Sequence, residues 1–144
     1  MSLSSYLKAW GFLPTERWRS RWRTALAMKS LCRAKIEISG LPFERWRRSL
    51  GCSLAGGDKA EARRWTSHVE WAARLLPFEL KCLPQAVALS RLLSRRRIGH
   101  TLVFAVRPSD MRDQPDALHA WVEIAGEKII GDLPGPWVET LRLG

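Results

Sequence analysis

The spacing of apolar residues changes once along this 144-residue chain, near Pro77, and that change limits the folds available to it. Before Pro77 the apolar residues recur every three or four positions, as in Trp65, Val69, Ala72 and Leu76, which is the period of a helix. After residue 100 they alternate with their neighbours, which is the period of a strand. The sequence therefore predicts an α+β fold, with a helical N-terminal half followed by a small antiparallel sheet.

The first expected helix begins after Thr15, a residue type that caps helix N-termini. Trp18, Trp22, Ala25 and Leu26 then share one face at helical spacing. We expect this face to lie in the core, with the interleaved arginines forming a solvated basic rim around it.

Two further helices are expected before Pro77. A short one should follow Pro42 and end at Gly51, because glycine commonly terminates helices. A longer one should start after Asp58, which with Glu61 makes a variant of the capping box. The helical half should therefore end at Pro77, which cannot continue a helix.

After Pro77 the sequence predicts one more helix and three strands. Cys82 lies at or just before the start of that helix, because Pro84 favours a first helical turn. Strands are expected at 101–106, 118–124 and 128–132, the last two joined by a hairpin turn near 125–127. In the middle strand, the period of two places His119, Trp121 and Glu123 on one face and the apolar residues between them on the other.

Composition narrows the class of protein. Three cysteines without CxxC spacing argue against a disulfide framework and a zinc site, and we expect no cofactor and no metal. The sequence has neither a signal-peptide pattern nor an apolar run long enough to cross a bilayer, so we expect a cytoplasmic protein without a membrane partner. A single domain is expected over 1–144, with a helical part at 1–58 and a catalytic core at 59–144.

Positive charge is concentrated in the first part of the chain. The net charge is +10, and residues 1–80 carry 15 Lys and Arg against 7 Asp and Glu. A basic face raises the local concentration of acidic partners. Charge alone does not distinguish a nucleic acid, an anionic lipid surface and an acidic peptide.

Cys82, His119 and Asp132 form the pattern that can carry chemistry. A helix N-terminus stabilises a thiolate, which is the nucleophilic form of cysteine, and Cys82 alone among the cysteines has that setting; Cys32 and Cys52 are read as structural. A nucleophilic thiol needs a base, and the base needs an orienting acceptor. His119 on one strand and Asp132 on the next supply both within antiparallel pairing distance.

This order of cysteine helix, histidine strand and aspartate strand resembles the papain-like and transglutaminase-like catalytic core. More narrowly, the run CLPQA from Cys82, the run LHAWV around His119 and the pair GD ending at Asp132 resemble the lasso-peptide leader peptidases. The resemblance implies a cysteine-bearing helix packed on a small antiparallel sheet. It also implies that Cys82, His119 and Asp132 are nucleophile, base and orienting residue.

Two other residues are expected at the site. Trp121 shares a strand face with His119 and should form a wall beside the imidazole. The oxyanion should be met by the Cys82 backbone N–H and one further donor, for which Gln85 is a candidate.

The resemblance further implies partners and a pathway. The substrate would be the leader region of a ribosomally made precursor, delivered by a separate leader-recognition protein and followed by a lasso cyclase. Two alternatives remain open: a transglutaminase-like transferase that forms amides, and a basic protein that binds nucleic acid or peptide. Trp18 and Trp22 among arginines would suit nucleic-acid stacking, although such a stripe more often packs in a core.

Overall fold

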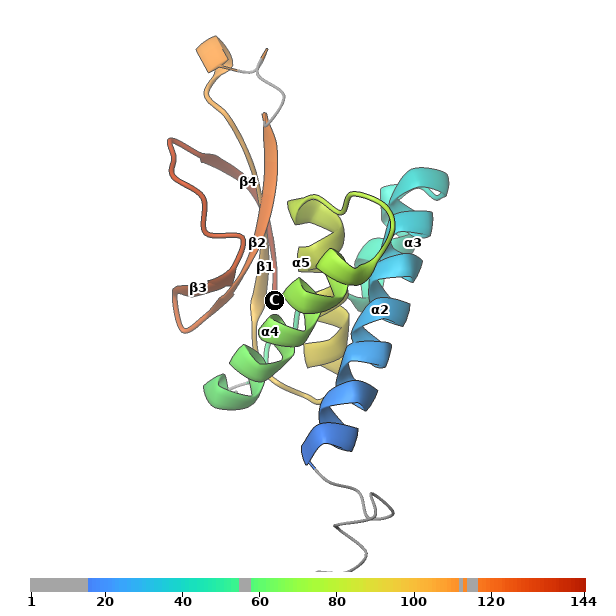
Figure 1. The fold of residues 1–144 in the computed structure, drawn as a ribbon. Helices are drawn as coiled ribbons and strands as arrows, with labels where there is room; N and C mark the ends of the chain where they lie inside the picture. Colours follow the sequence, from blue (N-terminus) through green and yellow to red (C-terminus); the bar gives the residue numbers. More distant parts are fainter. Residues whose placement is uncertain (1–15, 55–57, 112, 114–116) are drawn as a thin grey trace, which may run out of the picture.

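The computed structural model describes residues 16–54, 58–111, 113 and 117–144. Thr15, the expected cap of the first helix, lies outside these residues. Within them the protein is an α+β structure in which the helices precede an antiparallel sheet in the chain and cover one of its faces (Figure 1). This confirms the predicted fold class.

The helical layer contains the elements expected from the sequence, together with one short 3-10 turn. The described helices are α2 (Glu16–Gly40), α3 (Phe43–Trp46), the 3-10 helix η1 (Arg47–Ser49), α4 (Lys59–Leu75) and α5 (Cys82–Arg95). The predicted cap of α4 is confirmed, because the Asp58 carboxylate accepts from the backbone N–H of Glu61 at 3.1 Å. In the described part of the chain, none of the helices has the length and apolar character required to cross a bilayer.

The sheet has one more strand than the sequence predicted. Its described strands are β1 (Thr101–Val106), β2 (Leu118–Ile124), β3 (Glu127–Ile130) and β4 (Val138–Leu143), with η2 (Ser109–Met111) between the first two. All pairs are antiparallel and the order is β3-β2-β1-β4. The hairpin turn between β2 and β3 is confirmed: Ala125 and Gly126 have φ values of 51° and 79°, as the tight turns of hairpins require.

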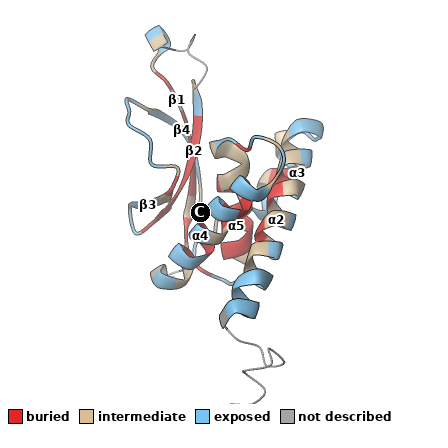
Figure 2. Cartoon of the chain, viewed as in Figure 1, coloured by how far each residue is buried: buried red, intermediate tan, exposed pale blue. Residues whose placement is uncertain are grey.

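The predicted buried face of α2 is wrong. Trp18 and Trp22 are 60% and 59% exposed, whereas Ala27, Leu31 and Ala34 are fully buried. Packed helices approach to about 8–10 Å between axes, and small side chains on either side of Leu31 permit that approach to α4 and α5. The indoles of α2 therefore lie outside the core. Figure 2 shows the first turns of α2 coloured as exposed.

The two faces of β2 belong to different apolar clusters, as the alternation predicted. Ala120, Val122 and Ile124 pack into the main core with the helices. Trp121 lies on the opposite face, in a small cluster with Val103 and Ala105 of β1. His119 contacts the Trp121 ring and thus shares this second face.

Candidate active site

Cys82 is the first residue of α5, as predicted, and its thiol reaches the start of β2. The side chain is half-buried, and Sγ lies 4.0 Å from the backbone oxygen of Leu118, the residue before His119. A helix leaves the N–H groups of its first turn without partners inside the helix, and Lys81 makes no side-chain cap here. The thiol therefore stands beside backbone donors that favour negative charge.

A cleft of about 520 Å³ opens beside the thiol. Its walls come from α2, through Lys35, Ile38 and Ser39, and from the start of β2, through Leu118. The α4–α5 connection closes one side, where Lys35 donates to the Glu79 backbone oxygen at 3.4 Å. Sequence reasoning placed α2 outside the catalytic core, and the structure instead makes its C-terminal half a wall of the cleft.

Cys82 and the segment that carries Asp132 adjoin the same edge of β2. The backbone N–H of Arg107 donates to the Ala117 oxygen at 2.8 Å, so that oxygen points toward β1. Carbonyl groups alternate along a strand, and the Leu118 oxygen therefore points to the opposite edge, where β3 pairs. Gly131 lies at this edge too, since a Cβ added to it would meet a β2 carbonyl oxygen at 2.6 Å.

The His119 imidazole is buried, and its described partners include two indole rings and a backbone oxygen. The ring is 1% exposed, stacks on Trp137 with centroids 4.8 Å apart, and lies 5.8 Å from the Trp121 ring. Its Nε2 lies 2.5 Å from the Gly131 oxygen. A carbonyl oxygen only accepts, so Nε2 carries the proton and the lone pair of the neutral ring is on Nδ1.

The structure brings the three predicted catalytic residues to one end of β2 without joining them. Among the described contacts, neither Cys82 and His119 nor His119 and Asp132 form a hydrogen bond. Asp132 is exposed, and the Gly131 oxygen takes the place at Nε2 that sequence reasoning gave to the Asp132 carboxylate. The catalytic triad thus remains a prediction.

Trp121 and Gln85 are placed as follows. Trp121 lies beside the imidazole, as expected, but is 2% exposed and donates from Nε1 to Glu123 at 2.8 Å. Gln85 Nε2 donates to the Leu80 oxygen at 2.7 Å, so its amide is committed to the chain preceding α5. In this conformation the Gln85 amide is therefore not available as the second oxyanion donor.

Glu123 is a charged neighbour of this face. Burial alone would raise the pKa of Glu123, but hydrogen bonds from Trp121 and Arg142, with the positive charges of Arg142 and Lys128, hold it below the ordinary value. Glu123 consequently stays ionised, and its 2.7 Å bond with Arg142 ties β2 to β4.

Trp137 and Arg107 are site residues that sequence reasoning missed. The Arg107 guanidinium lies 3.9 Å from the centre of the Trp137 ring and donates to the backbone oxygens of Pro134 and Pro136, at 3.3 and 3.4 Å. Trp137 in turn stacks on His119. The only sequence signal was an aromatic residue after a proline-rich turn, which by itself indicates no contact.

No metal centre accompanies these groups in the residues that the structure describes. The His, Cys, Asp and Glu side chains there do not gather in threes at metal-binding distance.

The fold and the site together define a recognisable class: an antiparallel sheet with helices on one face, and a cysteine opening the helix that packs on the histidine-bearing strand. The family model for the transglutaminase-like superfamily matches residues 17–140, and the chain belongs to that superfamily. The superfamily includes cysteine peptidases and transferases. The match includes α2, well beyond the motifs at Cys82, His119 and Asp132. No curated protein and no solved structure matches the chain significantly.

Proposed function

We propose that the protein is a cysteine peptidase that removes the leader from a ribosomally made lasso-peptide precursor, with a separate protein delivering that leader. The observation that carries the peptidase part is the position of Cys82: it opens α5, lines a cleft and touches the residue before His119. The lasso-peptide part is supported by the CLPQA, LHAWV and GD motifs.

In this proposal the Cys82 thiol gives its proton to His119 Nδ1 and its sulfur attacks the scissile carbonyl carbon. The Cys82 backbone N–H donates to the resulting oxyanion. The imidazolium then protonates the leaving amine, and water resolves the acyl-enzyme by the same base. The Gly131–Asp132 segment holds Nε2 throughout, which keeps Nδ1 as the basic nitrogen.

The reaction requires the thiol and Nδ1 to meet around the edge of β2. Catalytic hydrogen bonds are often long without substrate and tighten in the complex. The contact between the thiol and the Leu118 oxygen is at the long limit of such bonds. Replacing this contact with one to the imidazole therefore costs little free energy. We expect a peptide in the cleft to displace the thiol toward the imidazole.

The test is cleavage of a synthetic precursor in the presence of the leader-recognition protein. Cys82→Ala should abolish cleavage and leave precursor binding intact, because it removes one sulfur atom at a half-buried position. Cys52→Ala is the matched control, since Cys52 is also a half-buried free cysteine and does not line the cleft, and this variant should cleave normally. Full activity of Cys82→Ala would refute the proposal.

A separate experiment, with a primary amine added to the reaction, tests the transferase alternative. An added primary amine should leave the products unchanged if water is the acceptor, and mass spectrometry should find free leader carboxylate alone. An amide adduct that forms at the expense of hydrolysis would identify a transferase instead. His119→Asn should reduce the cleavage rate on the order of 100-fold or more, since it removes the base.

A further inference from the structure

An apolar groove of about 660 Å³ runs between the N-terminal half of α2 and the C-terminal half of α4. Ala25 and Met28 line it from α2, and Trp71 and Leu75 from α4. Trp71 is 54% exposed and Leu75 51% exposed, so large apolar side chains face solvent here. Exposed apolar surface of this kind marks binding sites more often than chance.

The groove is preformed. Thr24 Oγ1 lies 3.1 Å from His68 Nδ1, which ties α2 to α4 at the groove floor, and Arg23 donates to Glu61 at 3.4 Å beside it. Burial, with the positive charge of Arg23, lowers the pKa of His68 from 6.5, so the floor is uncharged at neutral pH. A rigid, neutral floor binds apolar side chains without an ordering cost.

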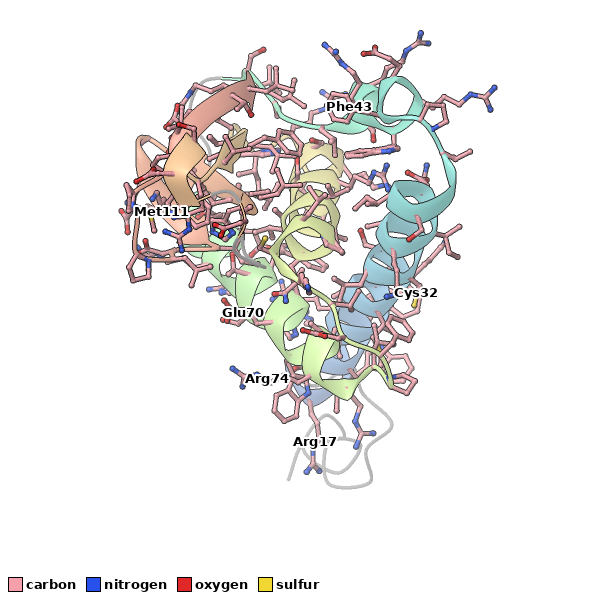
Figure 3. All side chains as sticks on the ribbon, turned by 90° about the horizontal axis from the view of Figure 1, so that it is seen from above. Arg17, Cys32, Phe43, Glu70, Arg74 and Met111 are labelled. Atoms are coloured by element: carbon pink, nitrogen blue, oxygen red, sulfur yellow. The ribbon has the colours of Figure 1, made fainter. Side chains whose placement is uncertain are left out.

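The rim of the groove is basic. Arg21 lines it, and Arg17 lies one helical turn before Arg21 on the same face of α2. Arg74 follows Trp71 on α4, and Figure 3 shows Arg17 and Arg74 projecting outward from the helices. Glu70 is the acidic residue on this stretch of α4, so the arginines leave a net positive charge. A basic rim around an apolar floor complements a peptide that combines acidic and large apolar residues.

One stripe of α2 connects the groove to the Cys82 cleft. Positions separated alternately by four and three residues lie on one helix face. Such a series here is Arg21, Ala25, Met28, Cys32, Lys35 and Ser39, of which the first three line the groove and the last two line the cleft. At 1.5 Å per residue, Ala25 of the groove and Lys35 of the cleft are about 15 Å apart along the helix, a distance that about five extended residues span.

We infer that the groove between α2 and α4 binds an acidic, apolar-rich segment of the peptide substrate, about five or more residues from the bond that Cys82 cleaves. The shared stripe favours the substrate itself as occupant, because one chain can then lie in both sites. The identification of this peptide as the substrate rests on the proposed peptidase function. The binding of such a peptide in the groove does not depend on that function.

Binding is tested on the full chain carrying Cys82→Ala, so that catalysis plays no part. The probe is a short fluorescein-labelled peptide in which leucine and phenylalanine alternate with glutamate, followed by fluorescence anisotropy. Arg21→Glu and Ala25→Glu change exposed helix positions and should weaken binding roughly tenfold or more. Arg48→Glu, an equal change of charge at an exposed position on η1, should weaken it less than about twofold.

Three results would overturn the inference. Equal weakening by Arg21→Glu and Arg48→Glu would mean that long-range charge alone attracts the probe. Equal binding of a probe with lysine in place of glutamate would remove the preference for acidic peptides. The third result is tighter binding of an oligothymidylate, with an affinity that falls steeply as salt rises and is lost in Arg21→Glu. That result would assign to nucleic acid the surface of α2 that carries Trp18, Trp22 and the arginines between them.

Kinetics with a cleavable precursor separates this inference from the proposed function. Arg21→Glu in the otherwise unchanged protein should raise KM roughly tenfold and leave kcat unaltered, since the groove is remote from the thiol. If the parent protein binds the probe at the groove yet cleaves no precursor, the peptidase proposal fails while the groove stands as a peptide site. If it cleaves with KM insensitive to Arg21→Glu, the groove inference fails alone.

Discussion

Replacing Gly131 with alanine tests the arrangement around the imidazole most directly. Gly131 has a φ of 78°, and its oxygen is the partner of His119 Nε2. An added Cβ would lie 2.6 Å from the Ala120 oxygen and 3.1 Å from Trp121 Cβ. Backbone atoms cannot swing aside as a flexible side chain does, so the 131–132 segment must move away from β2.

The cost has three parts. Alanine in the left-handed region is destabilised by about 1–2 kcal/mol. Overpacking of a tight contact adds about 1–3 kcal/mol, and loss of the bond to His119 adds about 1 kcal/mol. We therefore expect Gly131→Ala to lower the free energy of unfolding by about 3–6 kcal/mol.

Gly126→Ala is the matched control. Gly126 has nearly the same φ, 79°, but a Cβ there would meet nothing within 4 Å. It should cost about 1–2 kcal/mol, the backbone part alone. Urea denaturation followed by the fluorescence of the 8 tryptophans measures both variants.

Activity provides the second readout for this pair. Displacing the partner of the imidazole should reduce the cleavage rate of folded Gly131→Ala on the order of tenfold or more, whereas Gly126→Ala should cleave normally. Equal destabilisation of the two variants would refute the close approach of Gly131 to β2. An unchanged rate in Gly131→Ala would refute its role in holding His119.

Three further predictions concern other parts of the structure. Burial lowers the pKa of His100 from 6.5, despite its hydrogen bond with a backbone oxygen, so the unfolded chain takes up the proton first. The free energy of unfolding should be constant above about pH 6.5 and fall below that pH by up to ~1.4 kcal/mol per pH unit. Denaturation measured as a function of pH should show that His100→Gln removes the part of this fall that is due to His100. Trp137→Leu should reduce kcat more than Trp137→Phe, with about 1 kcal/mol lost in thermal melts, because only an aromatic ring stacks on the imidazole; equal rates would contradict this. Arg91→Met should cost about 3 kcal/mol, since it strips a buried partner from the Glu37 carboxylate, whereas the exposed Arg33→Met should cost under about 1 kcal/mol by urea titration; a reversed order would show that Arg33 is the stronger partner.

Structural features that depend only on residues close together in the sequence were predictable. The Asp58 cap, the helix start at Cys82, and the turn at Ala125 and Gly126 each depend on a few adjacent residues. The side of the sheet on which His119 lies follows from the alternation of side chains along β2. Such features need only local sterics and hydrogen bonding, which a short stretch of sequence specifies.

Contacts between distant segments were not predictable in the same way. The stripe at Trp18 and Trp22 has the right period for a core face, but the small residues around Leu31 are the ones that α4 and α5 cover. Strand β4, with its largely exposed residues, offers little alternation to detect, yet it pairs with β1 along its length.

The sequence by itself predicted which residues act as nucleophile and base, because that prediction needs only residue type, helix start and strand period. Only the tertiary structure decided that α2 walls the cleft, that the Gly131 oxygen meets the imidazole, and that Trp137 covers it. The physical reason is that the local pattern of a strand or helix sets which way a side chain points. What it meets there depends on segments far along the chain, whose approach is set by the packing of the whole core.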